Sequence, residues 1–332
     1  MKFGIRLPNS GPLATRENMV KVAEEAEKLG FDSIWVHDHI LWGTEQHRTH
    51  LSAGSAEALD KTQGPNFYES ITTLSYIAGR TTNVRLGIAV LVVPLRNPVV
   101  LAKQLANLDV MSEGRLIVGV APGAPNITRP EFDAVGMPYG ERGEITDEYI
   151  KALKRIWSEN QPSFSGKYVN FREVQIFPKP VQKYPKILVG GGERGISPRA
   201  LKRVIEIGDG WIPAYLTREE IREGIRLLKV SAGSMGGDSE KYVIVHEMFA
   251  LVDEDSETAR GLAAKSLSTN FESVDEGEKR SLIGNPKQLA EKLQAYSEAG
   301  VHLTELKFVY GDLPALMKMM KLFADRVAPY VN

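Results

Sequence analysis

Three consecutive glycines, Gly190-Gly191-Gly192, followed by Ser197 at the start of a predicted helix, are the clearest indication of a ligand site in the chain. Glycines let several backbone N–H groups converge, and the start of a helix adds partial positive charge, so the pattern suits a phosphate. The same glycines would also suit a flexible turn that needs positive φ. We favour phosphate binding, since barrel enzymes commonly hold phosphate in their later strand-to-helix loops.

Asp38 and His39 directly follow a short predicted strand at residues 33–36. Imidazole titrates near neutral pH, so His39 could give or take a proton from a bound cofactor or substrate, with Asp38 setting its tautomer. Because neighbours along a strand face opposite ways, one of His37 and His39 is expected to point into the strand–helix layer. We expect that one to be His37. Trp42 could stack on a planar ring or anchor its own loop.

Other kinds of site find less support. The chain contains no cysteine, which excludes thiolate catalysis and Cys-ligated metals, and no GxSxG sequence follows a strand. No metal site is predicted, because the early histidines lack carboxylates at ligand spacing. Three arginines could meet anionic groups, although single arginines are more often solvated or structural. The histidines are His37, His39, His47 and His50, and the arginines are Arg96, Arg129 and Arg142.

Residues 85–120 show which elements position these groups. They form a strand, a helix and a second strand, with Asn97 and Pro98 at the helix start and Gly114 at its end. Both strands are nearly continuous apolar runs, as expected for parallel strands covered on both faces.

This unit repeats along the chain, which predicts a single α/β domain over residues 1–332 with the (β/α)8 fold of a TIM barrel. A doubly wound sheet is the alternative, but LPNSGP after the first strand lacks the glycine fingerprint of a dinucleotide fold. Insertions are expected at about 43–64, 121–143, 160–182, which contains a hairpin, and 253–283. The predicted strands are 3–7, 33–36, 85–90, 116–120, 186–189, 210–213, 242–252 and 303–309.

In such a barrel the residues just after each strand build the active site. This places one set of positions in one neighbourhood: Asn9, Asp38, His39, 93–97, 121–126, 190–197 and His246. The formal net charge of −1 makes nucleic acid and anionic membranes improbable partners, so a small-molecule substrate is expected. No apolar run approaches a membrane span and no signal core precedes the first strand, so a cytoplasmic protein is expected.

Six motifs in one order resemble the bacterial luciferase-like superfamily, whose members are flavin- or deazaflavin-dependent oxidoreductases on a (β/α)8 barrel. The resemblance covers nearly the whole chain and is more specific for the superfamily than for a substrate. The motifs are MKFGIRLPNSGP, EEAEKLGFDSIWVHDHILW, RLGIAVLVVPLRNPVVLAKQLANLDVMSEGRLIVGV, ERGEITDEYIKALKRIW, VQIFPKPVQKYPKILVGGG and GNPKQLAEKLQAYSEAGV.

The resemblance implies a cofactor position. The third strand would end in a non-proline cis peptide, Ala89–Val90, which bulges against the central ring of the cofactor. The phosphate would be held by residues after the fourth and fifth strands, which are Ala121, Pro122 and Gly123, and Gly190 to Gly192. In the coenzyme F420 branch, Asp-His after strand two lies beside the ring, and Asp38-His39 matches.

The resemblance favours coenzyme F420 and hydride transfer to or from a small organic substrate; the alternative is FMN with O2 as a monooxygenase. Some members that oxidise alcohols or sugar phosphates carry a glutamate after strand four, where this chain has about Ala124, so those reactions are in doubt. Substrate choice would lie in loops 43–64 and 121–143. A homodimer through the helices after strands two and three is also implied. Outside the resemblance, a metal-assisted barrel hydrolase and a non-catalytic binding protein stay open.

Overall fold

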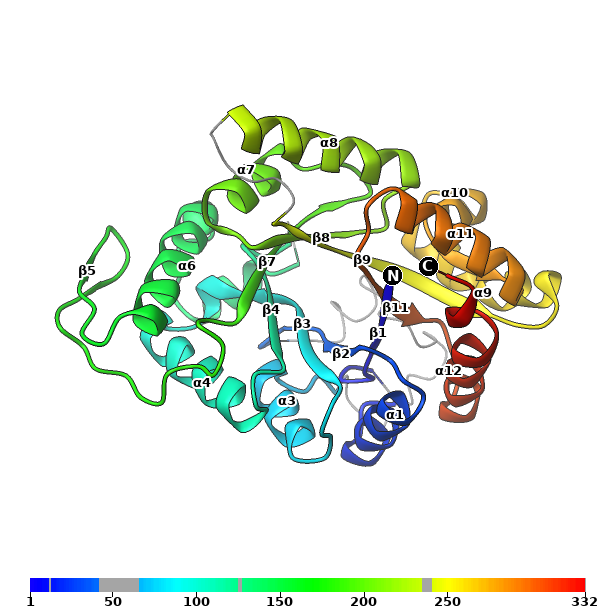
Figure 1. Ribbon diagram of the computed structural model, residues 1–332, viewed down its shortest axis with the longest axis horizontal. Coiled ribbons are helices and arrows are strands. Elements are labelled where there is room, and N and C mark those ends of the chain that lie inside the picture. The colour runs from blue at the N-terminus through cyan, green and yellow to red at the C-terminus, as the bar shows by residue number, and fades with distance from the viewer. Residues whose placement is uncertain (12, 42–65, 125–126, 235–240, 332) are drawn as a thin grey trace.

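The structure is a closed barrel of parallel strands surrounded by helices (Figure 1). This computed structural model describes residues 1–11, 13–41, 66–124, 127–234 and 241–331. In spatial order the barrel strands are β1 (Lys2–Arg6), β2 (Ser33–Val36), β3 (Arg85–Val92), β4 (Leu116–Ala121), β7 (Lys186–Glu193), β8 (Gly210–Ala214), β9 (Val243–Val252) and β11 (Leu303–Phe308). Since β11 pairs with both β9 and β1, the ring closes. The eight predicted strands and the barrel fold are confirmed.

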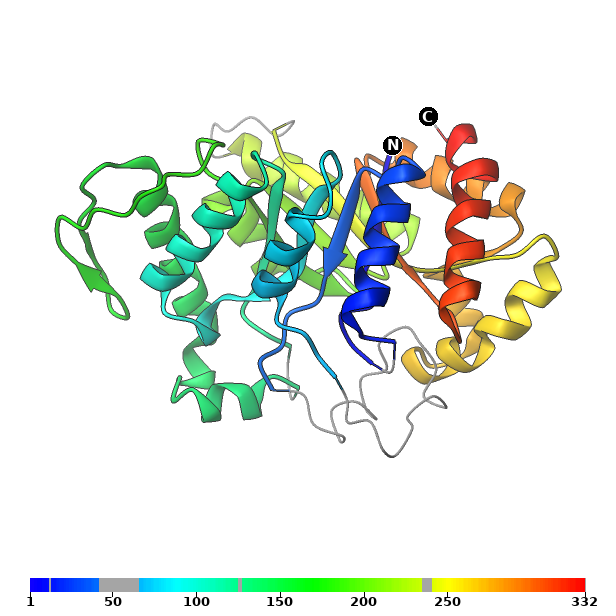
Figure 2. The same cartoon turned by 90° about the horizontal axis from the view of Figure 1, so that it is seen from below.

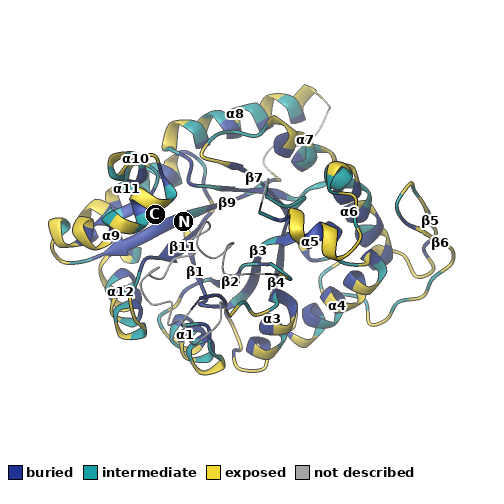
Figure 3. Cartoon of the chain, turned by 180° about the vertical axis from the view of Figure 1, so that it is seen from behind, coloured by how far each residue is buried: buried dark blue, intermediate teal, exposed yellow. Residues whose placement is uncertain are grey.

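The helices cover the outside of the barrel, with buried faces inward and exposed faces outward (Figure 3). Side chains that accept backbone N–H bonds begin several of them, as the sequence predicts: Asn97 Oδ1 accepts from Val99 and Val100. The helices are α1 (Arg16–Lys28), α3 (Ser70–Ala78), α4 (Pro98–Met111), α5 (Arg129–Ala134), α6 (Arg142–Ser158), α7 (Pro198–Ile207), α8 (Arg218–Ser234), α9 (Ser256–Asn270), α10 (Val274–Lys279), α11 (Pro286–Glu298) and α12 (Leu313–Arg326), with 3-10 turns at Val93–Leu95, Tyr139–Glu141 and Ala328–Tyr330.

Trp35 fills the bore of the barrel. A Cβ at Gly4 or Gly87, on the two strands that flank β2, would lie only 2.3 or 2.2 Å from atoms of the Trp35 ring. The indole N–H donates to Ser33 Oγ at 2.8 Å, so this buried polar group is satisfied. An apolar cluster therefore closes the floor of the barrel: Trp35, Ala89, Ile117, Leu188, Ile212, Val245 and Leu303.

The insertions depart from the expected pattern in one place. Strand β10 (Leu282–Gly284), inside the insertion expected at 253–283, pairs in parallel with the last residues of β9. The sequence analysis does not predict this strand, because three residues are too short to show a periodicity. The predicted hairpin within 160–182 is confirmed as β5 (Phe164–Ser165) and β6 (Asn170–Phe171), and it projects from the edge of the molecule in Figure 1.

The strands run so that their C-terminal ends share one end of the barrel, and Figure 2 shows the two chain termini at the other end. The insertion expected at 43–64 lies outside the described residues. Among the helices described, none is long and apolar enough to cross a membrane.

Candidate active site

A cavity of about 960 Å³ lies at the C-terminal ends of the strands. Its size is in the range of small-molecule and cofactor sites. Trp42 lies outside the described residues. The other residues predicted to act in catalysis or to bind the cofactor line this cavity: Asp38, His39, Ala89, Val90, Ala121, Pro122, Gly123, Gly190, Gly191, Gly192 and Ser197. Residues as far apart in sequence as His37 and Lys307 thus meet around one space.

Strand β3 bulges into the cavity at Ala89 and Val90. The peptide bond between them is cis, and the pairing with β4 shifts register between Ile88 and Leu91, which confirms the predicted bond and bulge. Two glycines, one on β4 and one on the following strand β7, leave room for the Val90 side chain. A Cβ at Gly119 or Gly190 would lie 3.1 or 2.9 Å from Val90 Cγ1.

The glycine loop after β7 brings the start of α7 to the cavity. Gly191 and Gly192 have φ of 143° and 94°, a region that favours glycine, and a Cβ at Gly191 would lie 2.6 Å from that of Ala200. The Trp211 indole N–H fixes the loop by donating to the Gly191 carbonyl at 2.7 Å. Ser197 Oγ accepts from the Ala200 N–H and begins the helix. The loop therefore presents a helix N-terminus to the cavity.

Basic side chains surround this loop. Three of them are ion-paired with neighbouring carboxylates: Arg194 with Glu193, Lys202 with Glu206 and Arg203 with Asp147. Arg199, also on the cavity wall, makes no ion pair within the part of the chain that the structure describes. Arg199 and the start of α7 are thus the groups best placed to bind an anion.

His39 is oriented by a buried carboxylate that the sequence analysis does not find. Its Nδ1 lies 2.9 Å from Oε2 of Glu131, a residue of α5 that is 1% exposed. The other oxygen of Glu131 accepts from the backbone N–H groups of Ile40 and Leu41, at 2.7 and 3.2 Å. Glu131 therefore ties α5 to the segment after β2. A glutamate in a loop insertion, distant in sequence from its partner, gives no sequence signal of this role.

Asp38 has a different environment from the one expected. Its carboxylate accepts from both Nη atoms of Arg96, from the hydroxyl of Ser70 and from the N–H of Val92. Burial alone would lower the pKa of Arg96, but the carboxylates of Asp38 and Glu69 raise it above its ordinary value. Asp38 thus joins the ends of β2 and β3. The carboxylate that contacts His39 Nδ1 is Glu131, and the expectation that Asp38 sets the tautomer is corrected accordingly.

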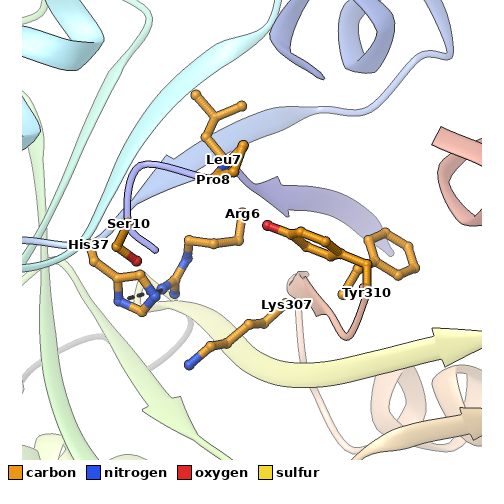
Figure 4. A pocket seen from close by; sticks show the side chains of 8 residues that line it. Arg6, Leu7, Pro8, Ser10, His37, Lys307 and Tyr310 are labelled. Carbon is orange, nitrogen blue, oxygen red and sulfur yellow. Dashed lines mark hydrogen bonds between the residues drawn. The ribbon is translucent and has the colours of Figure 1, made fainter. Parts of the chain in front are cut away.

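The predicted orientation of His37 is also wrong. Both His37 and His39 line the cavity, because β2 ends at Val36 and the alternation of a strand does not extend to them. The His37 ring contacts Nη1 of Arg6 (Figure 4). Asn9 holds the segment through hydrogen bonds with the backbone of His37 and Tyr68, so it is a structural residue.

His246 does not belong to the cavity, contrary to the sequence-based grouping. It is fully buried in the strand–helix layer, where its Nε2 accepts from the Leu216 N–H and its ring packs on Tyr296. Burial lowers its pKa to about 3. Of the three arginines considered, Arg142 lines the cavity, Arg96 binds Asp38, and Arg129 is exposed beside Asp133.

A cluster of charged residues inside the upper barrel is missing from the sequence analysis. Arg6 of β1 is ion-paired with Glu305 of β11 and with Glu247 of β9, at 3.0 Å in the latter case. Lys307 of β11 lies near Arg6 (Figure 4), with its Nζ 3.9 Å from Oε1 of Glu247. The signal is a charge at alternate positions in apolar strands, as in LTELKF. A small cavity of about 10 Å³, enough for one water molecule, adjoins Arg6, His37, Lys307 and Tyr310.

Residues 1–275 match the family described as luciferase-like monooxygenase. The chain belongs to this family. Its predicted superfamily and enzyme class, a luciferase-like oxidoreductase, are confirmed. Within the described residues no group of three or more histidine and carboxylate side chains is placed to hold a metal ion.

Two curated relatives of this luciferase-like protein use different cofactors. An FMNH2-dependent dimethylsulfone monooxygenase of Pseudomonas putida is 28% identical to this chain, in an alignment that covers 80% of this chain and 79% of the relative. An F420-dependent glucose-6-phosphate dehydrogenase of Kineococcus radiotolerans is also 28% identical, in an alignment that covers 84% of this chain and 83% of the relative. A solved F420-dependent secondary alcohol dehydrogenase in complex with an F420-acetone adduct shares the fold, with a TM-score of 0.80 at 18% identity over 100% of this chain and 99% of that one. The luciferase-like family thus includes both FMN- and F420-dependent enzymes.

Proposed function

We propose that the protein binds coenzyme F420 in the large cavity and transfers hydride to or from a small organic substrate. The observation that carries this proposal is the continuity of the cavity from the β3 bulge at Ala89–Val90 to the N-terminus of α7. A site for a flat ring at one end and a site for a phosphate at the other would suit the two parts of a flavin-type cofactor.

The residues present fit such a cofactor. At Gly191, any larger residue would place a Cβ against Ala200, and its φ of 143° favours glycine, so the loop can approach a phosphate closely. Ala89 offers only a methyl group where the ring would lie. We assign ring contacts to Ala89 and Val90. The phosphate would be held by Gly190 to Gly192 and Ser197, with Ala121 to Gly123 beside it.

When bound, a deazaflavin supplies hydride transfer, whereas reduced FMN supplies O2 activation. The protein contributes orientation and proton movement. We assign proton movement at the cofactor to His39, whose Nδ1 is held by Glu131 so that the imidazole keeps one orientation at the cavity wall. Asp38 positions this segment through Arg96. Trp42, outside the described residues, stays a predicted ring-stacking residue.

An FMN-dependent monooxygenase is the second candidate, favoured by the relative that uses FMNH2 over four-fifths of this chain. The F420 assignment is supported by the Asp38-His39 pair and by the F420-dependent relative of similar coverage. Arg199 offers a further cation for the carboxylate-bearing tail that F420 has and FMN lacks. We also propose a homodimer, which light scattering of the purified protein would test.

The deciding experiment is titration of the purified protein with FMN and F420, each oxidised and reduced, followed by fluorescence and by thermal unfolding. Ligand at 100 times its Kd should stabilise the fold by about 2.7 kcal/mol. We expect tighter binding of F420 than of FMN, and a loss of this preference in Arg199→Ala. Preferential binding of FMN would replace the favoured reaction by the second candidate, and binding of neither would refute both.

A further inference from the structure

Three ionisable side chains form the wall of the cavity opposite the β3 bulge. They are Tyr215, directly after β8, Glu247 of β9 and Lys307 of β11. In the eight-stranded ring, β9 is the fourth strand from β3 in either direction, so this wall faces Ala89 and Val90 across the cavity. On the proposed function, which this inference extends, the substrate lies between the cofactor ring and this wall.

Tyr215 is held rigidly in an uncommon conformation. Its φ is 56°, a left-handed value rarely adopted by an aromatic residue, and its ring stacks on Phe249 at 4.8 Å between centroids. Its hydroxyl donates to Glu247 Oε1 at 2.7 Å and accepts from Lys307 Nζ at 3.1 Å. Arg280 donates to its backbone carbonyl at 3.1 Å. The neighbours therefore fix the hydroxyl toward the cavity.

Glu247 has its two oxygens engaged, one by Tyr215 and the other by Arg6 at 3.0 Å. Burial favours its neutral form, but Arg6 and Lys307 hold the pKa of Glu247 below its ordinary value, so it stays ionised. Glu247 is thus a fixed negative charge that orients its neighbours.

Lys307 is the residue of this wall that still has N–H groups available to bind a ligand. Its side chain is 5% exposed. Its Nζ lies over the Phe249 ring, 4.6 Å from the ring centroid, and 3.9 Å from Glu247 Oε1. One of its three N–H groups is used by the Tyr215 hydroxyl. Burial lowers its pKa to about 8, against the opposing effect of Glu247. The charged and titratable groups that face it are Tyr215, Glu247, Arg6, Glu305 and Glu193.

We propose that Lys307, positioned by Tyr215 and Glu247, is the acid–base residue that contacts the substrate, and that the substrate presents a hydroxyl or carbonyl oxygen to it. An amine that titrates near neutral pH can accept the proton of an alcohol and, as ammonium, return it to a carbonyl, so alcohol oxidation here would not need the glutamate after strand four that this chain lacks. No other group of this wall combines a free N–H donor with contact to the cavity among the residues described.

The step balances as follows for oxidation of an alcohol. A bound oxidised deazaflavin or flavin would supply the two-electron oxidation by accepting the hydrogen of the reacting carbon, with its electron pair, as hydride. The O–H bond breaks, its proton passes to the neutral amine of Lys307, and the carbon–oxygen double bond forms. In reduction of a carbonyl each transfer is reversed, and the Lys307 ammonium supplies the proton.

The first test needs no cofactor. Trace acetylation of the free protein with acetic anhydride, over a pH series, is followed by mass spectrometry of the peptide containing Lys307. We expect a labelling midpoint near pH 8 for Lys307, against the value of about 10.4 that is typical of a lysine side chain in water. A midpoint near that typical value, or no labelling of Lys307 in the folded protein, would overturn the inference.

The second test uses whichever cofactor the protein binds and a set of secondary alcohols and ketones of three to eight carbons. We expect turnover by the wild type and a loss of about 100-fold or more in Lys307→Ala, with recovery on addition of ethylamine. Lys307→Met should bind cofactor with unchanged Kd, which shows that the fold is kept. Lys287→Met, exposed and outside the site, is the matched control.

The outcomes separate this inference from the proposed function. If neither cofactor binds, the proposed function fails, whereas the acetylation midpoint still reports on Lys307. If a cofactor binds and Lys307→Ala turns over like the wild type, only the role of Lys307 is refuted. Cofactor binding without turnover of any alcohol or ketone in the set would refute the substrate class.

Discussion

Burial has different consequences for the chemistry of two ionisable side chains in this protein, His246 and Lys307. His246 and Lys307 are both buried, on strands that pair with each other. His246 faces the helices and accepts one backbone hydrogen bond, whereas Lys307 faces the cavity among carboxylates. Burial keeps the first neutral and brings the second into the titration range of physiological pH. The side of the strand, rather than burial itself, therefore decides which residue can do chemistry.

His246 should make stability depend on pH. Its pKa falls from 6.5 to about 3 on folding, so below pH 6.5 the unfolded chain binds a proton that the folded chain does not. Stability should then fall with decreasing pH, by about 2 kcal/mol between pH 7 and pH 5 from this residue alone. His246→Gln keeps an acceptor for the Leu216 N–H and does not titrate. Urea unfolding of both proteins at the two pH values should show a smaller decrease in the variant; equal decreases would contradict the assignment.

His39 and Glu131 should act as a pair on turnover. His39→Ala should lower kcat by about 10² to 10³-fold while leaving cofactor Kd nearly unchanged. Glu131→Gln keeps an acceptor for the N–H groups of Ile40 and Leu41 but loses the charge beside the imidazole, so a smaller decrease is expected. The double variant should be no slower than His39→Ala. Additive losses would instead mean that Glu131 acts separately from His39.

At the scale of elements, the loop from β7 to α7 shows how local sequence builds a site. Positive φ at Gly191 and Gly192, the Trp211 hydrogen bond and the Ser197 cap together direct one helix start at the cavity. These features are local in sequence, which is why the glycine run and the serine are sufficient to predict the loop. The contact between His39 and Glu131 joins residues 92 positions apart and could not be predicted in this way.

Gly191→Ala tests the loop as a unit. The added methyl would meet the Cβ of Ala200 at 2.6 Å and would require a φ that alanine disfavours, so the loop should move. We expect at least a tenfold rise in the Kd for cofactor, or for inorganic phosphate, measured by calorimetry. Gly261→Ala, where nothing lies within 4 Å, is the control and should bind as the wild type does. Unchanged affinity in Gly191→Ala would place the phosphate elsewhere.

For the whole molecule, regular repetition made the barrel predictable. Eight apolar runs alternating with helical segments suffice to indicate parallel strands closed into a ring. The interior charges were not predictable in the same way, because alternate charges such as those in LTELKF mark a single strand and do not show that Arg6, Glu247 and Lys307 meet. Only closure of the ring brings the three together. Strand β10 was missed for the opposite reason, since its pairing needs only three residues.

Packing of the barrel floor should be sensitive to single methyl groups. A Cβ at Gly87 would lie 2.2 Å from the Trp35 ring, and the ring is enclosed by neighbouring strands. Gly87→Ala should therefore destabilise the fold by about 1–3 kcal/mol through overpacking. Gly79→Ala, at the exposed end of α3 with no atom closer than 3.7 Å, should change stability little. Denaturant unfolding of both variants measures the difference, and equal stabilities would show that the floor can rearrange.

Trp35 and its apolar neighbours also determine the order in which ligands can bind and dissociate. Because they seal the bore below the cavity, the barrel is a cup with one opening and not a channel with two. A ligand bound at the closed end of the cavity can leave only after a second ligand bound above it has left. A cofactor seated on the β3 bulge at the bottom of this cup would have to bind first and depart last, so the architecture favours ordered kinetics in which substrate and product exchange over a resident cofactor.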